Sequence, residues 1–96
     1  MLKLVNKIVL INGRRTSMRM SNKEWHAFDD VCKSENISRN ELLSMIEKLK
    51  DNNLGLTYST RLFILSYFRQ LASNTVANND NFPQLLTYAL QDLGKK

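Results

Sequence analysis

Near the start of the chain, apolar and polar residues alternate as in a β-strand. Further on, the apolar residues recur at the three- and four-residue spacing of an α-helix. Residues 4–20 are rich in Val, Ile, Thr and Met and are interrupted by Asn12-Gly13, the dipeptide most typical of a tight hairpin turn. We therefore expect a leading strand over residues 3–11 and a second strand over residues 14–20. A two-residue turn and a bulged three-residue turn both fit this stretch, so the pairing register stays open.

The second strand is two-faced, because successive side chains of a strand point to opposite sides. One face is polar and cationic and consists of Arg15, Ser17 and Arg19. The other face is mostly apolar and consists of Thr16, Met18 and Met20. Arg14 falls on the side opposite Arg15, near the turn.

Two helices opened by serine caps follow, and we expect them over about residues 22–35 and 39–50. Each begins with a capping box, in which the serine oxygen accepts a free helix N–H and a glutamate three residues later reaches back; the pairs are Ser21 with Glu24 and Ser38 with Glu41. Asn36 is a suitable left-handed stop for the first helix. Their predicted buried sides are Trp25, Phe28, Val31 and Cys32, then Leu42, Leu43, Met45, Ile46 and Leu49.

A third helix is expected at about residues 58–72, and it is apolar on most sides, which places it centrally. Its apolar residues are Leu62, Phe63, Ile64, Leu65, Tyr67, Phe68 and Leu71. An Asn-rich connection, SNTVANNDN over residues 73–81, follows. A last helix is then expected to begin with Pro83 and to end at Gly94, with an apolar stripe of Leu86, Ala89, Leu90 and Leu93. The pattern predicts a mainly helical α+β chain with three to four helices, divided into a domain of residues 1–72 and a linker with a C-terminal helix over 73–96.

The positive charge of the chain is concentrated at one end. Residues 1–20 contain five basic residues and no acidic one, whereas the remainder contains nine of each. A local basic surface on an otherwise balanced domain is typical of a protein that binds a polyanion.

Composition excludes several other classes of function. One cysteine and one histidine allow neither an internal disulfide nor an ordinary four-ligand zinc site, and no glycine-rich phosphate loop is present. We therefore expect no catalytic residues, no metal and no cofactor. No apolar run reaches the roughly 18 to 20 residues that cross a bilayer, so we expect a cytoplasmic protein without a membrane partner.

The two-faced strand offers the more specific chemistry. A 96-residue domain is small enough to benefit from self-association, and an unpaired strand edge favours a partner strand. Antiparallel pairing with the same strand of a second chain would place Arg15, Ser17 and Arg19 of both chains on one face. A two-stranded ribbon fits the DNA major groove, where arginine donates two hydrogen bonds to guanine.

The segment RTSMRMSNKEWHAFDDVCKSENISRNELLSMIEKL resembles the ribbon-helix-helix family of DNA-binding proteins, of the Arc and MetJ type. In particular, GRRTSMRM followed by a tryptophan and then by STRLFILSYFR resembles a small bacterial subgroup of that family. The resemblance covers roughly residues 12–70. The leading strand over residues 3–11 is an addition to the minimal pattern, and residues 73–96 match no part of it.

The resemblance implies an intertwined homodimer whose antiparallel ribbon enters the major groove of double-stranded DNA. Whether dimers stack on the DNA stays open. It assigns Arg15, Ser17 and Arg19 to the bases and the start of the second helix, at Ser38, Arg39 and Asn40, to a phosphate. For Arg14, near the turn, a phosphate contact and plain solvation both stay open. The expected dimer core is Met18, Met20, Trp25, Phe28, Leu42 and Ile46.

Two functions follow from this interpretation. The first is sequence-specific DNA binding by a homodimer, as a transcriptional repressor that occludes a promoter. The alternative is an antitoxin or other protein-interaction module that binds a partner protein through the helix at residues 82–93. That helix could equally close the core of its own domain.

Overall fold

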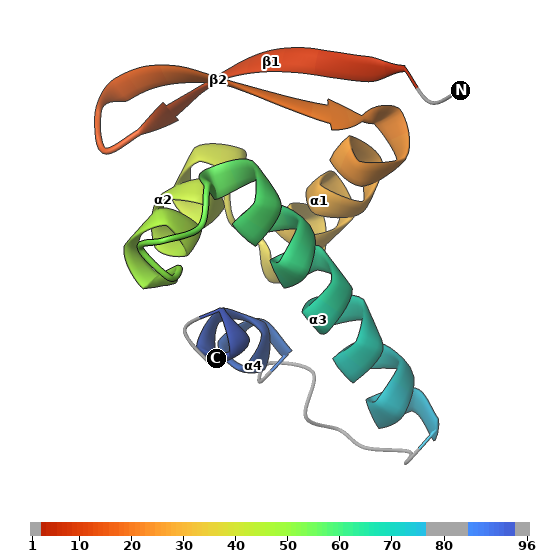
Figure 1. Cartoon of the computed structure of the whole chain (residues 1–96). Coiled ribbons are helices and arrows are strands. Elements are labelled where there is room, and N and C mark those ends of the chain that lie inside the picture. The colour runs from red at the N-terminus through yellow and green to blue at the C-terminus, as the bar shows by residue number, and fades with distance from the viewer. Residues whose placement is uncertain (1–2, 77–84, 94–96) are drawn as a thin grey trace.

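A β-hairpin lies across one end of a group of helices (Figure 1). The computed structural model describes residues 3–76 and 85–93. In chain order its elements are β1 (Leu4–Ile11), β2 (Arg14–Ser21), α1 (Asn22–Glu35), α2 (Arg39–Leu49), α3 (Leu56–Val76) and α4 (Leu85–Asp92). The chain is thus mainly helical α+β, as the pattern predicts.

The hairpin closes through a two-residue turn. Asn12 and Gly13 both have positive φ, 54° and 79°, as the central residues of a type I′ turn require. Ile11 therefore pairs with Arg14, and the antiparallel register continues from there to Leu4 and Ser21. Of the two turns compatible with the sequence, the shorter one is present.

Local sequence signals determine where α1 and α2 begin. The side chain of Ser21 accepts the Glu24 N–H, and the Glu24 carboxylate accepts the Ser21 N–H in return. The same reciprocal pair forms between Ser38 and Glu41 at α2. Asn36 ends α1 in the left-handed conformation, with φ of 57°, because a short polar side chain tolerates this region better than most.

The third helix is longer than the sequence pattern indicates. We expected residues 58–72, whereas α3 spans Leu56–Val76, so the predicted domain end at residue 72 falls within a helix. The first residues of the Asn-rich connection are thus helical. The rest of that connection, together with Pro83 and Gly94, lies outside the described residues.

One hydrophobic core joins the hairpin to the helices. Its fully buried side chains include the six that we expected in a dimer core: Met18, Met20, Trp25, Phe28, Leu42 and Ile46, each at most 2% exposed in the single chain. Met45 and Leu49, predicted on the buried side of the second helix, are instead exposed, and so is Leu65 on the third helix. The apolar sides of α2 and α3 are therefore narrower than their sequences suggest.

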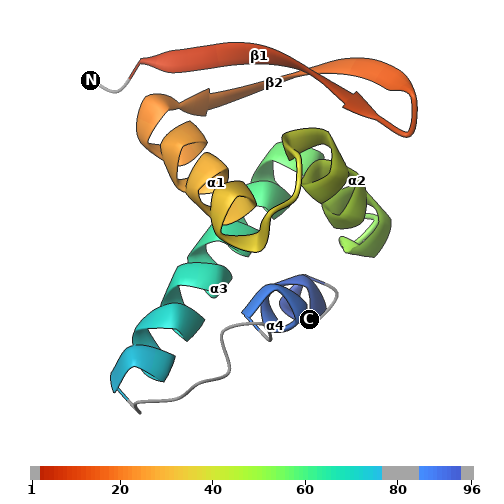
Figure 2. The same ribbon diagram turned by 180° about the vertical axis from the view of Figure 1, so that it is seen from behind.

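The last helix packs against the long third helix, at the end of the molecule away from the hairpin (Figure 2). Leu85, Ala89 and Leu93 are buried in the common core, and Leu86 and Leu90 are half-buried beside it. The apolar stripe of this helix is therefore used within the chain. Over the described ranges, no helix combines the length and apolar character needed to cross a membrane.

Candidate nucleic-acid interface

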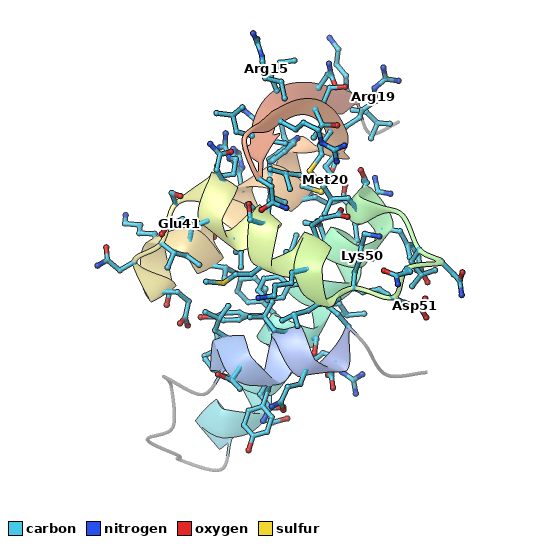
Figure 3. The ribbon with its side chains drawn as sticks, turned by 90° about the vertical axis from the view of Figure 1, so that its left-hand side faces the viewer. Arg15, Arg19, Met20, Glu41, Lys50 and Asp51 are labelled. Carbon is cyan, nitrogen blue, oxygen red and sulfur yellow. The ribbon has the colours of Figure 1, made fainter. Side chains whose placement is uncertain are left out.

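The outer face of the hairpin, which points away from the helices, has a row of polar side chains from β2. Arg15, Ser17 and Arg19 are exposed, while Met18 between them is buried beneath the strand. Figure 3 shows Arg15 and Arg19 projecting outward from the ribbon, with Met20 on its inner side. The strand therefore presents the two faces that its alternation predicts, and we call its exposed row, Arg15, Ser17 and Arg19, the cationic row.

The leading strand adds a second, different row to the same face. The register pairs Asn6 with Arg19 and places Ile8 and Leu10 directly across from Ser17 and Arg15. Asn6, Ile8 and Leu10 are all exposed. Sequence reasoning missed this row, because IVLI is apolar at every position and only the pairing register determines which of its side chains point outward.

The inner face of the hairpin is held to α1 by one tryptophan. Trp25 is 1% exposed and donates its indole N–H to the carbonyl oxygen of Val5, at 2.9 Å. The Lys7 Nζ lies 5.6 Å and the Arg39 Cζ 5.2 Å from the centre of its ring. Trp25 thereby connects β1, α1 and the start of α2, and the hairpin has a fixed position over the helices.

The beginning of α2 lies beside the outer edge of β1. The Asn40 side-chain oxygen accepts the backbone N–H of Leu10 at 3.0 Å, which satisfies a strand-edge donor that β2 cannot reach. The first turn of any helix leaves backbone N–H groups without an intrahelical partner, and these attract anions. The three residues predicted to contact a phosphate, Ser38, Arg39 and Asn40, are thus brought next to the hairpin.

Each of these three residues also has a structural contact. Ser38 and Glu41 form the capping box, so the Glu41 carboxylate occupies part of the helix start and its pKa is lowered by the Ser38 N–H that it accepts. Arg39 donates to both oxygens of Asp29, at 3.0 Å, while lying over Trp25. Its guanidinium is half-buried and oriented by these contacts.

Arg14 lies on the other side of the strand from the cationic row, as its sequence position predicts. It pairs with Ile11 beside the turn and is exposed. Together with Thr16, Glu47 and Leu56 it lines a shallow groove of about 130 Å³ between the hairpin and the helices. Arg14 is therefore not part of the cationic row on the outer face.

Two titratable side chains, Cys32 and Tyr67, are buried in the core. Burial, followed by the nearby Asp29 carboxylate, raises the pKa of the Cys32 thiol to about 11, so the thiol stays protonated at neutral pH. Burial and a hydrogen bond donated to Glu35 raise the pKa of the Tyr67 hydroxyl to about 12. Both side chains act as core residues.

A comparison with protein families identifies the class to which this arrangement belongs. Residues 4–68 match the ribbon-helix-helix domain, which includes both strands and most of α3. The match extends over more than half of the chain, and the protein therefore belongs to the ribbon-helix-helix family. Domains of this family are typically non-enzymatic and bind DNA.

The leading strand is part of the family match, because the match begins at its first residue. Comparisons with curated proteins and with solved structures found no significant match.

Proposed function

We propose that the protein is a sequence-specific double-stranded DNA-binding protein that places the outer face of its hairpin in the major groove and represses transcription. The observation that carries this proposal is the exposed cationic row, Arg15, Ser17 and Arg19, on a ribbon that a buried core holds in place. Arginine recognises guanine through two hydrogen bonds, and serine can pair with several base edges. A fixed strand with these side chains at alternate positions suits base recognition.

The phosphate contacts of the proposal come from positions flanking the hairpin. The backbone N–H groups at the start of α2 and the side chain of Asn40 lie at the edge of β1, where a groove-bound ribbon approaches a DNA backbone. Arg39 would add positive charge there, although Asp29 already neutralises part of it. Arg14 would contact a phosphate near the turn.

Homodimer formation remains part of the proposal. The edge of β2 that does not face β1 has backbone groups that another strand could pair with. Repression would then follow from occlusion of a promoter by dimers, alone or side by side. The mass of the complex on a defined DNA duplex, measured by analytical ultracentrifugation, determines how many chains bind.

Substitution of Arg19 tests the proposal most directly. A target sequence is first selected from a random duplex pool, and affinities are then measured for that target and for an unrelated duplex. We expect Arg19→Ala to weaken binding to the target by about 1 to 3 kcal/mol and to change binding to the unrelated duplex much less. Arg69→Ala, an exposed arginine on α3, is the matched control and should behave as the unaltered protein.

The outcome that contradicts the proposal is equal loss for Arg19→Ala and Arg69→Ala, or no selection of any sequence from the pool.

The alternative function, an antitoxin or protein-interaction module working through residues 82–93, has less support. The apolar side chains of α4 that would contact a partner, Leu85, Ala89 and Leu93, are buried within this chain.

A further inference from the structure

We propose that Asn40 is a positioning residue that couples the phosphate-binding start of α2 to the base-reading residue Arg15. Its side chain holds the turn end of the hairpin at a fixed place beside the helix, so that the phosphate contact at α2 and the base contact of Arg15 are made together. This role rests on the proposed function and adds to it the residue that aligns two of the DNA contacts.

The Asn40 side chain can face the strand in one orientation only. Its Oδ1 atom accepts the Leu10 N–H at 3.0 Å, and because a backbone N–H can only donate, the amide oxygen must lie against β1. The Nδ2 group then has no partner among the described residues. Asn40 is also exposed, so this group can donate to a phosphate while the oxygen holds the strand.

The strand residue that Asn40 holds lies directly across the hairpin from a base-reading arginine. Leu10 pairs with Arg15 in the antiparallel register. The bond from Asn40 therefore fixes the backbone beside the point where the Arg15 side chain leaves the ribbon. A shift of the hairpin relative to α2 would move Arg15 away from the base that it contacts when α2 is bound to a phosphate.

The other end of the cationic row is linked to a different helix. Arg19 precedes Met20, and Met20 pairs with Val5. The carbonyl oxygen of Val5 accepts the indole N–H of Trp25, which belongs to α1. Loss of the Asn40 bond should consequently affect the Arg15 end of the row and leave the Arg19 end in place.

The position of the turn relative to α2 depends on this one bond. Among the described residues, no other hydrogen bond joins the hairpin to α2, and the two elements otherwise share the common apolar core. Apolar packing is non-directional, whereas a hydrogen bond requires a short distance and a narrow range of angles. Next to the bond lies a groove of about 470 Å³, lined by Asn12 and Gly13 of the turn and by Glu41 and Met45 of α2.

The same residue also belongs to the anion-attracting part of the helix start. The capping box already uses the N–H groups of Ser38 and Glu41, so the backbone N–H groups left for a phosphate are those of Arg39 and Asn40. The bond to Leu10 uses the edge of β1 that faces α2. It leaves the open edge of β2 to a partner strand, as the proposed homodimer requires.

A double-mutant cycle on DNA binding tests the coupling. The base pair read by Arg15 is first identified as the position of the selected element at which Arg15→Ala loses preference. We expect Asn40→Ala to lower the preference at that base pair by about threefold to tenfold, the size of one hydrogen bond, and to leave the preference at the base pair read by Arg19 unchanged. Asn40→Ala should therefore be non-additive with Arg15→Ala and additive with Arg19→Ala.

A second variant separates the two roles of the side chain. Asn40→Asp keeps an oxygen for the Leu10 N–H, but it loses the amide donor and places a negative charge beside the phosphate. This variant should retain the preference at the base pair read by Arg15 while binding every duplex more weakly. Asn52→Ala, an exposed asparagine beyond the other end of α2, is the matched control and should bind as the unaltered protein does.

Equal loss of affinity for every sequence on Asn40→Ala, additive with Arg15→Ala, would overturn the coupling, because Asn40 would then act as a phosphate contact alone. Arg19→Ala reports separately on the proposed function, since it should lose selectivity whether or not Asn40 positions the hairpin. If Arg19→Ala kept its selectivity, the proposed function and the coupling would both fail. Circular dichroism melting verifies that each variant folds, which these exposed substitutions should preserve.

Discussion

At the scale of single residues, the side chains that position the hairpin differ from those proposed to touch DNA. Trp25 contacts β1 through its indole N–H, and two cations, Lys7 and Arg39, lie within 5.6 Å of its ring centre. Arg39 in turn is held by Asp29. The cationic row projects in the other direction and is exposed. Substitutions on the outer face should therefore affect binding with little effect on folding.

Glu24 makes one residue-scale prediction about pH. Partial burial raises the pKa of its carboxyl, but the Ser21 N–H and the Arg61 guanidinium outweigh burial and hold the pKa below its ordinary value of 4.5. A carboxyl whose pKa is depressed on folding stabilises the protein above its unfolded pKa, and this stability is lost as the pH falls through the folded pKa.

We therefore compare the full chain with Glu24→Gln, which keeps an acceptor for the capping box and removes the charge that faces Arg61. At pH 7 the variant should be less stable by about 0.5 to 1 kcal/mol, because the ion pair is partly exposed. The difference should shrink below pH 4.5, as measured by urea unfolding at pH 7 and pH 3. Equal differences at both pH values would contradict it, and Arg61→Met should reproduce the same trend.

At the scale of elements, the hairpin turn depends on a backbone conformation that most residues avoid. Gly13 has φ of 79°, whereas Gly55, before α3, has no such requirement, and an added Cβ would meet no atom within 4 Å at either glycine. A serine substitution at each glycine therefore isolates the effect of backbone strain, because an added Cβ is crowded at neither position and only Gly13 has positive φ.

Gly13→Ser should lower the free energy of unfolding by about 1 to 2 kcal/mol, because a Cβ is disfavoured at positive φ. Gly55→Ser should cost nothing, since serine is well suited to the position that precedes a helix. Urea unfolding of both variants measures the difference. A Gly13→Ser variant as stable as Gly55→Ser would show that the turn is not constrained as described.

Elements set by adjacent residues were predictable from the sequence, and those set by distant contacts were less so. The turn at Asn12 and the caps at Ser21 and Ser38 form within a few residues, and they have the expected geometry. The outward placement of Ile8 depends on its pairing with β2. The exposure of Met45 depends on which side of α2 its neighbours cover. Neither property is contained in local periodicity.

The packing of α4 gives a second element-scale prediction. Leu85 is 1% exposed against the common core, whereas Thr87 on the same helix is exposed. Leu85→Ala should lower the free energy of unfolding by about 2 to 5 kcal/mol, as for other buried leucines, and Thr87→Ala should have little effect. Thermal unfolding of both variants checks this. If Leu85→Ala left stability unchanged, α4 would be available to a partner protein, as the alternative function requires.

At the scale of the whole molecule, charge and fold divide the protein into two ends. The hairpin and the start of α2 form one end, and α4 packs against α3 at the other (Figure 1). The five basic residues of the first 20 belong to the hairpin end, and no acidic residue occurs among those 20 positions. A polyanion should therefore approach the hairpin, and α4 should remain free of it.

The salt dependence of DNA binding tests which end of the molecule the DNA approaches. Each phosphate that a protein neutralises on duplex DNA makes log K fall with log salt concentration by about 0.9. Arg14, exposed beside the turn, is proposed to make one such contact, so Arg14→Gln should make the slope shallower by about 0.9 and weaken binding to every sequence alike. Arg69→Gln removes the same charge from α3, where the helix runs away from the hairpin, and should leave the slope unchanged. Fluorescence anisotropy titrations from 50 to 300 mM salt distinguish the two variants, and equal slopes for both would mean that Arg14 makes no phosphate contact.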